Sequence, residues 1–402
     1  MASILSEYIL KRWGVLELKA ELKNLINQYN TLTKRNLFVY AADFNKGRRG
    51  IDVSLMQDDF YTIQDILRES DKKQIDVYLE TPGGSGEAAE EIAKFLRKKF
   101  TEINFVIAGE AKSAGTILAL SGDSIYMCET GSLGPIDAQI QIGRSVVSAH
   151  DYKAWIDEKR NEATKTGKLN PFDAIMVAQI SPGEIYGVVN SLEFAKDLVK
   201  GWLEKYKFKD WTETQTTHKK VTAEMRKKRA EEVADKLCDH MSWRTHGRSL
   251  KIEDLKDVLS IENIDDNLPL AGIVYRIKTI IRLIFDTSTD YKLYFWEDFQ
   301  MARTAAMANA NLPTPMPISN KNHSIEQVFL NIRCPKCGKK YEIPGYFDIT
   351  SEKIKQLKLP INNKIHDNDV LVCDNLGCNF TIDLKSIKNQ IETQSKRKIT
   401  FK

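Results

Sequence analysis

Two strand-turn-helix units follow each other in the first third of the chain. Apolar, β-rich runs occupy residues 75–80 and 103–108, and each run ends at a turn that contains glycine. Apolar positions recur at helical spacing over residues 86–100, and small residues form a second helical segment over residues 113–120. A third strand is expected at residues 124–128. The pattern predicts an α/β unit organised around two successive glycine turns.

The two turns offer different chemistry. The first reads Thr-Pro-Gly-Gly-Ser-Gly over residues 81–86 and lies between a strand and a helix N-terminus, where backbone amides are unpaired. The second leads into Ser113 at the start of a helix, beside Ala114 and Gly115, which are small enough to let a substrate reach the hydroxyl and the following amide. Acyl transfer requires this combination of an oxyanion-binding amide and a nucleophile.

The hydrophobic pattern also predicts helices on both sides of these units. A first strand is expected at residues 36–40, and residues 139–147 are expected to form a hairpin or an extended segment near the active site. Residues 43–50 combine glycines with basic side chains, which predicts a solvated loop. The predicted helices cover residues 1–32, 55–68, 149–166, 189–206 and 221–241.

Composition and charge narrow the class of protein. The 402 residues are 42% hydrophobic, as in globular proteins with a sizeable core, and the net charge is +4. The basic run over residues 226–229 lacks interleaved aromatic side chains, so it is interpreted as a solvated helix face, and nucleic acid is not indicated as a partner. Charges interrupt the apolar stretch at residues 268–285, and no secretory leader opens the chain, so we expect a cytoplasmic protein without a membrane segment.

The pattern divides the chain into five segments. Two of these segments, the N-terminal arm and the one that contains residues 268–285, carry apolar stripes. Each stripe is expected to pack either on the core or against a partner subunit. The segments are an N-terminal helical arm at residues 1–34, a core at 35–262, an apolar helical extension at 263–311, a proline-rich linker at 312–324 and a small domain at 325–402.

Four of the six cysteines form two close pairs in the last segment. Cys334 and Cys337 make one pair, Cys373 and Cys378 make the other, and a glycine accompanies each pair. Zinc prefers soft ligands at tetrahedral corners, and two short loops with two thiolates each supply them. The pattern is similar to a zinc ribbon and predicts a structural zinc ion in a reducing compartment. The alternative is four unrelated reduced thiols.

Three motifs in this order resemble one known family. They are Thr-Pro-Gly-Gly at residues 81–84, Lys-Ser-Ala-Gly-Thr at residues 112–116 and Leu-Gly-Pro-Ile-Asp at residues 133–137. Over residues 35–250 the chain resembles the serine dehydrogenase proteinase family, a relative of signal peptide peptidase A and, more distantly, of the Clp protease proteolytic subunit.

The resemblance implies an α/β fold of the Clp and crotonase-like type, with repeated β-β-α units. It also implies Ser113 as the nucleophile and the backbone amides of Gly84 and Ala114 as the oxyanion hole. The Clp subunit carries its catalytic histidine shortly after the third strand, where this chain has residues 134–137 and no histidine. The signal peptide peptidase branch instead pairs its serine with a lysine from a later helix.

A lysine can act as a base only where burial lowers its pKa. On the helix predicted at residues 149–166, Lys159 falls among the apolar positions, whereas Lys153 and Lys165 point away from them. We therefore expect Lys159 to be the base, with Lys165, Lys153 and His246 as alternatives. His246 has a second interpretation, in which it caps or braces the fold.

Together these patterns predict a serine endopeptidase that acts on a protein or peptide substrate, forms a homo-oligomer and contains structural zinc. Two other classes stay open. A crotonase-type acyl-CoA enzyme would share the fold and the amide pair without needing Ser113, and a non-catalytic scaffold would act through the zinc ribbon. Reaction with a serine-directed fluorophosphonate separates the peptidase from both.

Overall fold

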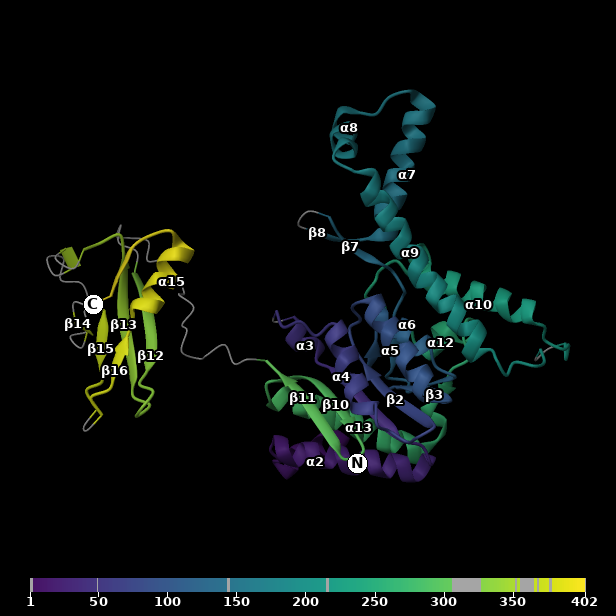
Figure 1. Cartoon of the computed structure of the whole chain (residues 1–402), viewed down its shortest axis with the longest axis horizontal. Helices are drawn as coiled ribbons and strands as arrows, with labels where there is room; N and C mark the ends of the chain where they lie inside the picture. The colour runs from purple at the N-terminus through teal and green to yellow at the C-terminus, as the bar shows by residue number, and fades with distance from the viewer. Residues whose placement is uncertain are drawn as a thin grey trace. The chain divides into compact units, whose positions relative to one another are not determined.

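The computed structural model contains two compact units, Met1–Thr304 and Ala305–Lys402 (Figure 1). The segments expected at residues 1–34 and 35–262 both fall within the first unit. The linker expected at residues 312–324 lies outside the described residues. The structure describes residues 3–48, 50–142, 145–214, 217–305, 327–350, 353–354, 365–366, 369–375 and 378–401.

Among the described residues, a seven-stranded sheet forms the centre of the first unit, in the order β11-β10-β1-β2-β3-β5-β9. The strands from β1 to β9 in this order pair in parallel, and β10 and β11 are antiparallel at one edge. The central strands are buried, as expected for parallel strands that are covered on both faces. The strands are β1 (Leu37–Ala42), β2 (Gln74–Glu80), β3 (Glu102–Ile107), β5 (Ser124–Met127), β9 (Glu262–Asn263), β10 (Asp290–Trp296) and β11 (Phe299–Thr304).

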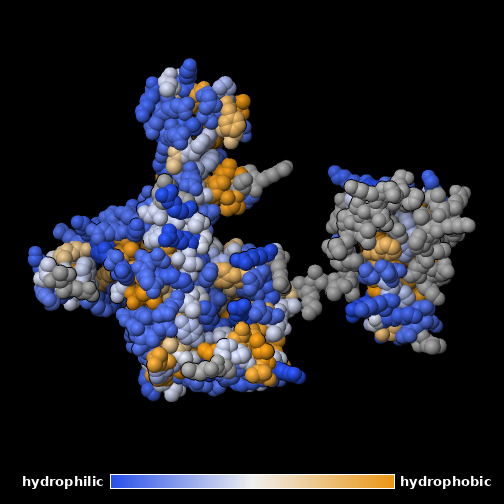
Figure 2. Space-filling model, turned by 180° about the vertical axis from the view of Figure 1, so that it is seen from behind, coloured by the Kyte–Doolittle hydropathy of each residue, from blue (hydrophilic) through white to orange (hydrophobic). Residues whose placement is uncertain are grey.

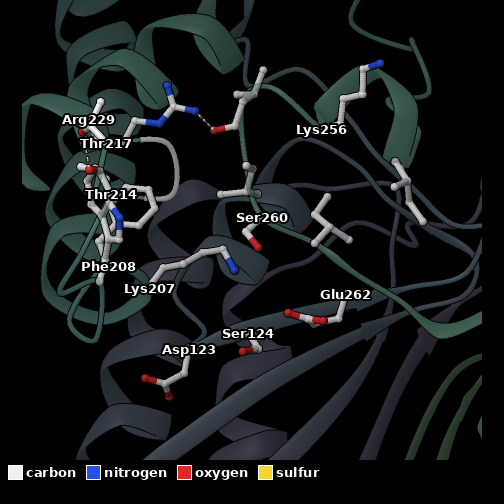
Figure 3. Close-up of a pocket in the computed structure, with 15 residues that line it drawn as sticks. Asp123, Ser124, Lys207, Phe208, Thr214, Thr217, Arg229, Lys256, Ser260 and Glu262 are labelled. Atoms are coloured by element: carbon white, nitrogen blue, oxygen red, sulfur yellow. Dashed lines mark hydrogen bonds between the residues drawn. The ribbon is translucent and has the colours of Figure 1, made fainter. Parts of the chain in front are cut away.

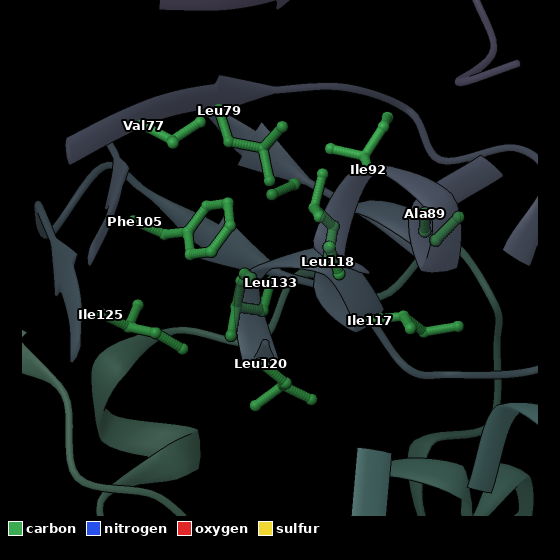
Figure 4. Packing of buried hydrophobic residues seen from close by; sticks show 14 of the residues in the cluster. Val77, Leu79, Ala89, Ile92, Phe105, Ile117, Leu118, Leu120, Ile125 and Leu133 are labelled. Carbon is green, nitrogen blue, oxygen red and sulfur yellow. The ribbon is translucent and has the colours of Figure 1, made fainter. Parts of the chain in front are cut away.

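Helices cover both faces of this sheet (Figure 1). Successive strand residues face opposite sides, so Leu79 packs in the cluster with α5 and α6, whereas Tyr78 packs in the cluster with α2 and α13. Figure 4 shows part of the first cluster, including Leu79, Phe105 and Leu118. The covering helices are α4 (Gln57–Leu67), α5 (Gly86–Lys99) and α6 (Ala114–Leu120) on one face, and α1 (Ile4–Lys11), α2 (Val15–Thr33) and α13 (Leu268–Thr287) on the other.

A small parallel sheet lies beside the main one. It consists of β4 (Glu110–Ala111) and β6 (Ser132–Leu133), each of which follows a main strand after a sharp turn. Gly131 occupies the second turn because a Cβ there would lie 2.2 Å from the carbonyl oxygen of Ile107. The repeated strand-strand-helix order agrees with the predicted Clp and crotonase-like fold.

The chain between β6 and β9 forms a hairpin and a group of helices, of which α7 and α8 project from the rest of the unit (Figure 1). The predicted hairpin is made of β7 (Gln139–Ile142) and β8 (Ser145–Ser148). No helix in the described parts of the chain is long and apolar enough to cross a membrane. The helices are α7 (Ala149–Thr166), α8 (Pro171–Ala178), α9 (Pro182–Trp202), a π-helical turn at Leu203–Lys207, α10 (Ala223–Cys238), α11 (His240–Trp243) and α12 (Ile252–Leu255).

The expectation of a helical extension at residues 263–311 is only partly correct. Helix α13 is present, but β10 and β11 follow it and complete the edge of the main sheet. A short apolar run fits a strand and a buried helix equally well in sequence. Pairing with β1, which is distant in sequence, decides the outcome.

The prediction of a solvated loop at residues 43–50 is wrong in one respect. It contains the short helix α3 (Phe44–Gly47), and Lys46 within it is buried. The Lys46 ammonium donates to the carbonyl oxygens of Phe285 and Asp290, at 2.5 and 2.6 Å, and pairs with Asp43. These contacts replace the water that a buried ammonium loses.

A buried ion pair connects β10 to the segment beside the first glycine turn. Lys292 Nζ lies 2.8 Å from Asp59 Oδ2 and donates to the carbonyl oxygen of Ser54 at 2.6 Å. Asp59 also accepts from the Tyr294 hydroxyl and from the Met56 N–H. The pair therefore holds the chain just before Leu55, which contacts Gly84.

Lys292→Met should destabilise the first unit strongly, by about 3–5 kcal/mol, because it leaves the Asp59 carboxylate buried without its counter-charge. The urea midpoint followed by circular dichroism measures the loss. Lys72→Met is the matched control, since Lys72 is solvated and its removal should change the midpoint little. Equal midpoints for the two variants would contradict the prediction.

The second unit is built on the antiparallel hairpin of β12 (Gln327–Arg333) and β13 (Lys340–Phe347), which β17 (Ile399–Phe401) extends. Buried apolar residues such as Leu330, Ile343 and Leu371 form its own core. The remaining elements are β14 (Ile365–His366), β15 (Val370–Val372), β16 (Thr381–Asp383) and α15 (Lys385–Ser395).

Candidate active site

Ser113 lies at the turn between β4 and α6. Its backbone has φ 49° and ψ −116°, a positive-φ conformation that residues with side chains rarely adopt. Such a conformation costs about 1–3 kcal/mol and persists only where the surrounding structure enforces it, most often at active sites. A serine held at a sharp strand-to-helix turn presents its hydroxyl to a substrate.

The first glycine turn packs directly against Ser113. A Cβ on Gly83 would lie 2.7 Å from the Ser113 Cβ, and a Cβ on Gly84 would lie 2.3 Å from the carbonyl oxygen of Leu55. Both glycines also have positive φ, 98° and 152°. Only glycine therefore lets this backbone approach the nucleophile so closely.

Gly84 and Ala114, whose amides are the expected oxyanion donors, both line the cavity that Ser113 lines. The N–H of Leu55 donates to Gly83 O at 2.7 Å, and the N–H of Ser85 donates to Leu55 O at 2.8 Å. Because neighbouring amides of an extended segment point to opposite sides, the Gly84 N–H faces away from Leu55. Ala114 is the first residue of α6, so its amide lacks an acceptor within the helix.

Hydrogen bonds connect the third motif, residues 133–137, to the second motif, residues 112–116. The Gly134 N–H donates to the Thr116 hydroxyl at 2.9 Å. Leu133 exchanges two backbone hydrogen bonds with Leu250, at 3.1 and 2.9 Å. These bonds bring a late segment of the chain, which contains His246, beside the nucleophile turn.

Lys112 holds the same late segment from the other side. Its ammonium donates to Ser249 Oγ at 2.7 Å and to the Arg248 carbonyl oxygen at 3.2 Å. Burial lowers the pKa of Lys112. The amine is bound to these groups and does not line the cavity in front of Ser113, so it braces the site.

His246 and Asp137 approach each other in the cavity that Ser113 also lines. His246 Nδ1 lies 3.9 Å from Asp137 Oδ2. The Asp137 side chain is 1% exposed and accepts from Ser148 Oγ at 3.0 Å and from Gln139 Nε2 at 2.8 Å. A carboxylate fixed in this way can orient an imidazole and stabilise its protonated form once a substrate tightens the contact.

One cavity of about 680 Å³ unites these groups. It is lined by four of the predicted site residues, together with Asp137 and side chains of α9 such as Phe194. Its volume is in the range of cavities that bind ligands in proteins. The four residues are Gly84, Ser113, Ala114 and His246.

Sequence comparison identifies this part of the chain. Residues 53–220 match the ClpP-like SDH-type serine proteinases. The predicted family and the predicted Clp-like α/β fold are both confirmed. The matched range contains all three motifs and ends before His246.

The chain is also similar to two uncharacterised proteins of Methanocaldococcus jannaschii, MJ0137 and MJ1495. They are 40% and 36% identical to it over 88 residues, or 20% of this chain. The matches cover 31% and 30% of those proteins, so the chain spans about a third of their length.

Two solved structures are also similar. A mutant of the 1510-N membrane-bound stomatin-specific protease is 13% identical, with 54% of this chain and 79% of that chain covered and a TM-score of 0.31. A mutant of ClpP1 from Listeria monocytogenes is 13% identical, with 54% and 90% covered and a TM-score of 0.28.

The three lysines expected as bases do not line the cavity. Lys159 lies 2.9 Å from Asp173 and within 3.2 Å of two further carboxylates. The hydrogen bond with Asp173 is the main cause that raises the pKa of Lys159, whereas a base needs a lowered pKa. The apolar burial predicted for Lys159 is therefore wrong. Lys153 pairs with Asp157 at 2.6 Å, and Lys165 is exposed.

The sequence analysis missed Asp137 as a site residue. In the sequence Asp137 is visible only as the end of the third motif, because His246 lies far from it along the chain. The available signal is the acidic residue that directly follows Gly-Pro-Ile in the third motif.

The four paired cysteines of the second unit converge. Cys334 and Cys378 have their Sγ atoms 3.6 Å apart, Cys337 and Cys373 have theirs 3.5 Å apart, and all four atoms lie within 4.8 Å of one another. Four sulfurs at 2.3 Å from a tetrahedral zinc ion would be about 3.8 Å apart. The cluster could therefore hold a metal ion.

Neighbouring groups lower the pKa of Cys337 and of Cys373 and so favour the metal-binding thiolate form of these two side chains, whereas burial raises the pKa of Cys378. The Lys339 backbone N–H lowers the pKa of Cys337 to about 6. The Tyr341 hydroxyl donates to Cys373 Sγ at 3.0 Å and to Asp374 at 2.7 Å. Such hydrogen bonds orient metal-binding side chains.

Proposed function

We propose that the chain is a serine peptidase in which Ser113 is the nucleophile and His246 is the general base. The single observation that supports this assignment best is the cavity that a strained Ser113, Gly84, Ala114 and the His246–Asp137 pair all line. The match to a serine proteinase family supports the same reaction class. The base differs from the lysine expected from sequence because Lys159 is held by carboxylates.

The steps follow from these positions. His246 accepts the Ser113 proton as the hydroxyl oxygen attacks the peptide carbonyl, and Asp137 stabilises the resulting imidazolium. The Gly84 and Ala114 N–H groups donate to the oxyanion of the tetrahedral intermediate. His246 then gives the proton to the leaving amine, and water releases the acyl group from Ser113 by the reverse sequence.

A fluorophosphonate should label Ser113 covalently, because it reacts with activated serines. Peptide mapping by mass spectrometry identifies the modified residue. Ser113→Ala should abolish labelling, whereas Ser191→Ala, at another serine of the same cavity, should retain it. No labelling of the folded chain would favour the acyl-CoA enzyme or the scaffold.

We propose that the second unit binds one structural zinc ion through Cys334, Cys337, Cys373 and Cys378. The sulfur geometry and the four-thiolate donor set support zinc. Zinc would cross-link the two cysteine loops of this unit. Because cysteines stay reduced and free of disulfides in a reducing environment, we place the protein in the cytoplasm.

We also propose that the chain forms a homo-oligomer. Large apolar side chains are exposed on α1, α2 and α8, among them Leu10 at 77%, Leu16 at 80% and Phe172 at 72%. Figure 2 shows hydrophobic patches on an otherwise hydrophilic surface. Light scattering at micromolar concentration should report a mass above the 45.9 kDa of one chain.

A further inference from the structure

A second cavity, of about 830 Å³, lies in the first unit and shares no lining residue with the Ser113 cavity (Figure 3). Lys207, the last residue of the π-helical turn at Leu203–Lys207, lines the cavity. Strand β9 contributes Glu262, and the segment before β9 contributes Ser260. π-Helical turns are rare in proteins, and those that occur are often found at functional sites.

Lys207 and Glu262 face each other across this space, with the Ser260 hydroxyl near them (Figure 3). Among the residues that the structure describes, neither side chain forms an ion pair or a hydrogen bond. Burial lowers the pKa of Lys207 to about 8, although Glu262 and Asp123 oppose this shift. The ammonium is thus poorly solvated and lacks a direct partner, so a bound anion would stabilise it.

The other charged groups of the cavity are already engaged or solvated. Asp123 is neutralised by Arg97 at 2.7 Å and by Lys209 at 2.5 Å. Arg229 donates to the carbonyl oxygens of Asp257 and Val258 and so holds the wall in place. Lys256 is exposed. Glu262 is exposed like Lys256, but it faces Lys207 across the cavity (Figure 3), so this cation and this anion remain available to a ligand.

Apolar and aromatic side chains form part of the remaining lining, next to the hydroxyl side chains of Ser124, Thr214 and Thr217. Phe208 and Trp211 form a tilted ring pair with centroids 6.0 Å apart, and Ile252 and Leu259 add aliphatic surface. A purely anionic ligand on Lys207 would be repelled by Glu262, whereas a ligand with adjacent opposite charges satisfies both groups. An α-amino acid has these charges on one carbon, next to a side chain that can cover the rings.

We propose that this cavity binds a free α-amino acid with an apolar or aromatic side chain. Its carboxylate accepts from Lys207, its ammonium pairs with Glu262, and its side chain packs on Phe208 and Trp211. This site is separate from Ser113, so it does not depend on the proposed peptidase activity.

Calorimetric titration of the full chain with L-phenylalanine and with L-leucine tests the proposal. N-acetyl-L-phenylalanine lacks the ammonium and L-phenylalaninamide lacks the carboxylate, so each should bind at least about tenfold more weakly than L-phenylalanine, given the strength of charge-assisted hydrogen bonds. This arm needs no variant and is independent of any folding defect. If neither amino acid binds at millimolar concentration, or if the blocked forms bind as well, the proposal is wrong.

Lys207→Met and Glu262→Gln should each weaken L-phenylalanine binding by at least about tenfold. Lys205→Met is the matched control, because Lys205 belongs to the same π-helical turn but contacts the Tyr206 ring outside the cavity lining. It should bind like the unmodified chain. Undiminished binding by a folded Lys207→Met variant would overturn the assignment.

Discussion

His246→Gln should lower kcat for a peptide substrate by about four orders of magnitude or more, as loss of the base does in serine proteases. Glutamine keeps a polar side chain in the cavity but cannot accept and return the serine proton. Because the His246 side chain is 30% exposed, the fold should be retained. Single-turnover kinetics and thermal unfolding, measured on the same preparation, separate lost chemistry from lost structure.

Lys159→Gln is the decisive companion variant. Lys159 is bound by Asp173 and two further carboxylates away from the Ser113 cavity, so its loss should leave kcat within about twofold, a change too small for a missing base. If the Lys159→Gln variant were inactive and the His246→Gln variant active, the assignment of His246 as the general base would be wrong. The serine would then act with a lysine, as the resemblance first implied.

Cys373→Ser should unfold the second unit while leaving peptidase activity in the first. Four-thiolate zinc sites bind with roughly 10–16 kcal/mol, which is comparable to or larger than the whole stability of a small domain. The separate apolar core of the first unit supports its independence. The zinc content measured by elemental analysis should fall from one zinc per chain to none. Limited proteolysis should remove the second unit.

Cys238→Ala is the control for this prediction, because Cys238 packs against the core of the first unit and is far from the paired cysteines in sequence. Its zinc content should be unchanged. Full zinc occupancy in the Cys373→Ser variant, or zinc-free protein whose second unit resists protease, would refute the structural role of the metal.

Local features of the fold could be predicted from sequence, and non-local ones could not. The glycine turns, the strands beside them and the position of Ser113 depend on neighbouring residues, so their pattern is explicit. The strand character of residues 290–304 depends on pairing with β1. The buried position of Lys46 depends in the same way on carbonyl groups near residues 285–290.

The same distinction explains the candidate site. The pairing of His246 with Asp137 requires the contacts of Leu133 and Lys112 with residues 248–250, which no periodicity reveals. Lys159 was correctly placed on α7, but its partner Asp173 belongs to α8. The pattern of one helix predicts which face is apolar, yet it cannot predict the charges that a neighbouring helix brings.

The position of β1 between β2 and β10 has a consequence for folding during synthesis. Strand β2 follows β1 closely, but β10 follows roughly 250 residues later, a delay of about 12–50 s at ordinary translation rates. Until then one edge of β1 is open, and α13 cannot yet cover the apolar face that it shares with α2. The nascent chain therefore exposes an unpaired strand edge, which chaperones can bind. The sheet of the first unit is completed only after its last strands have left the ribosome.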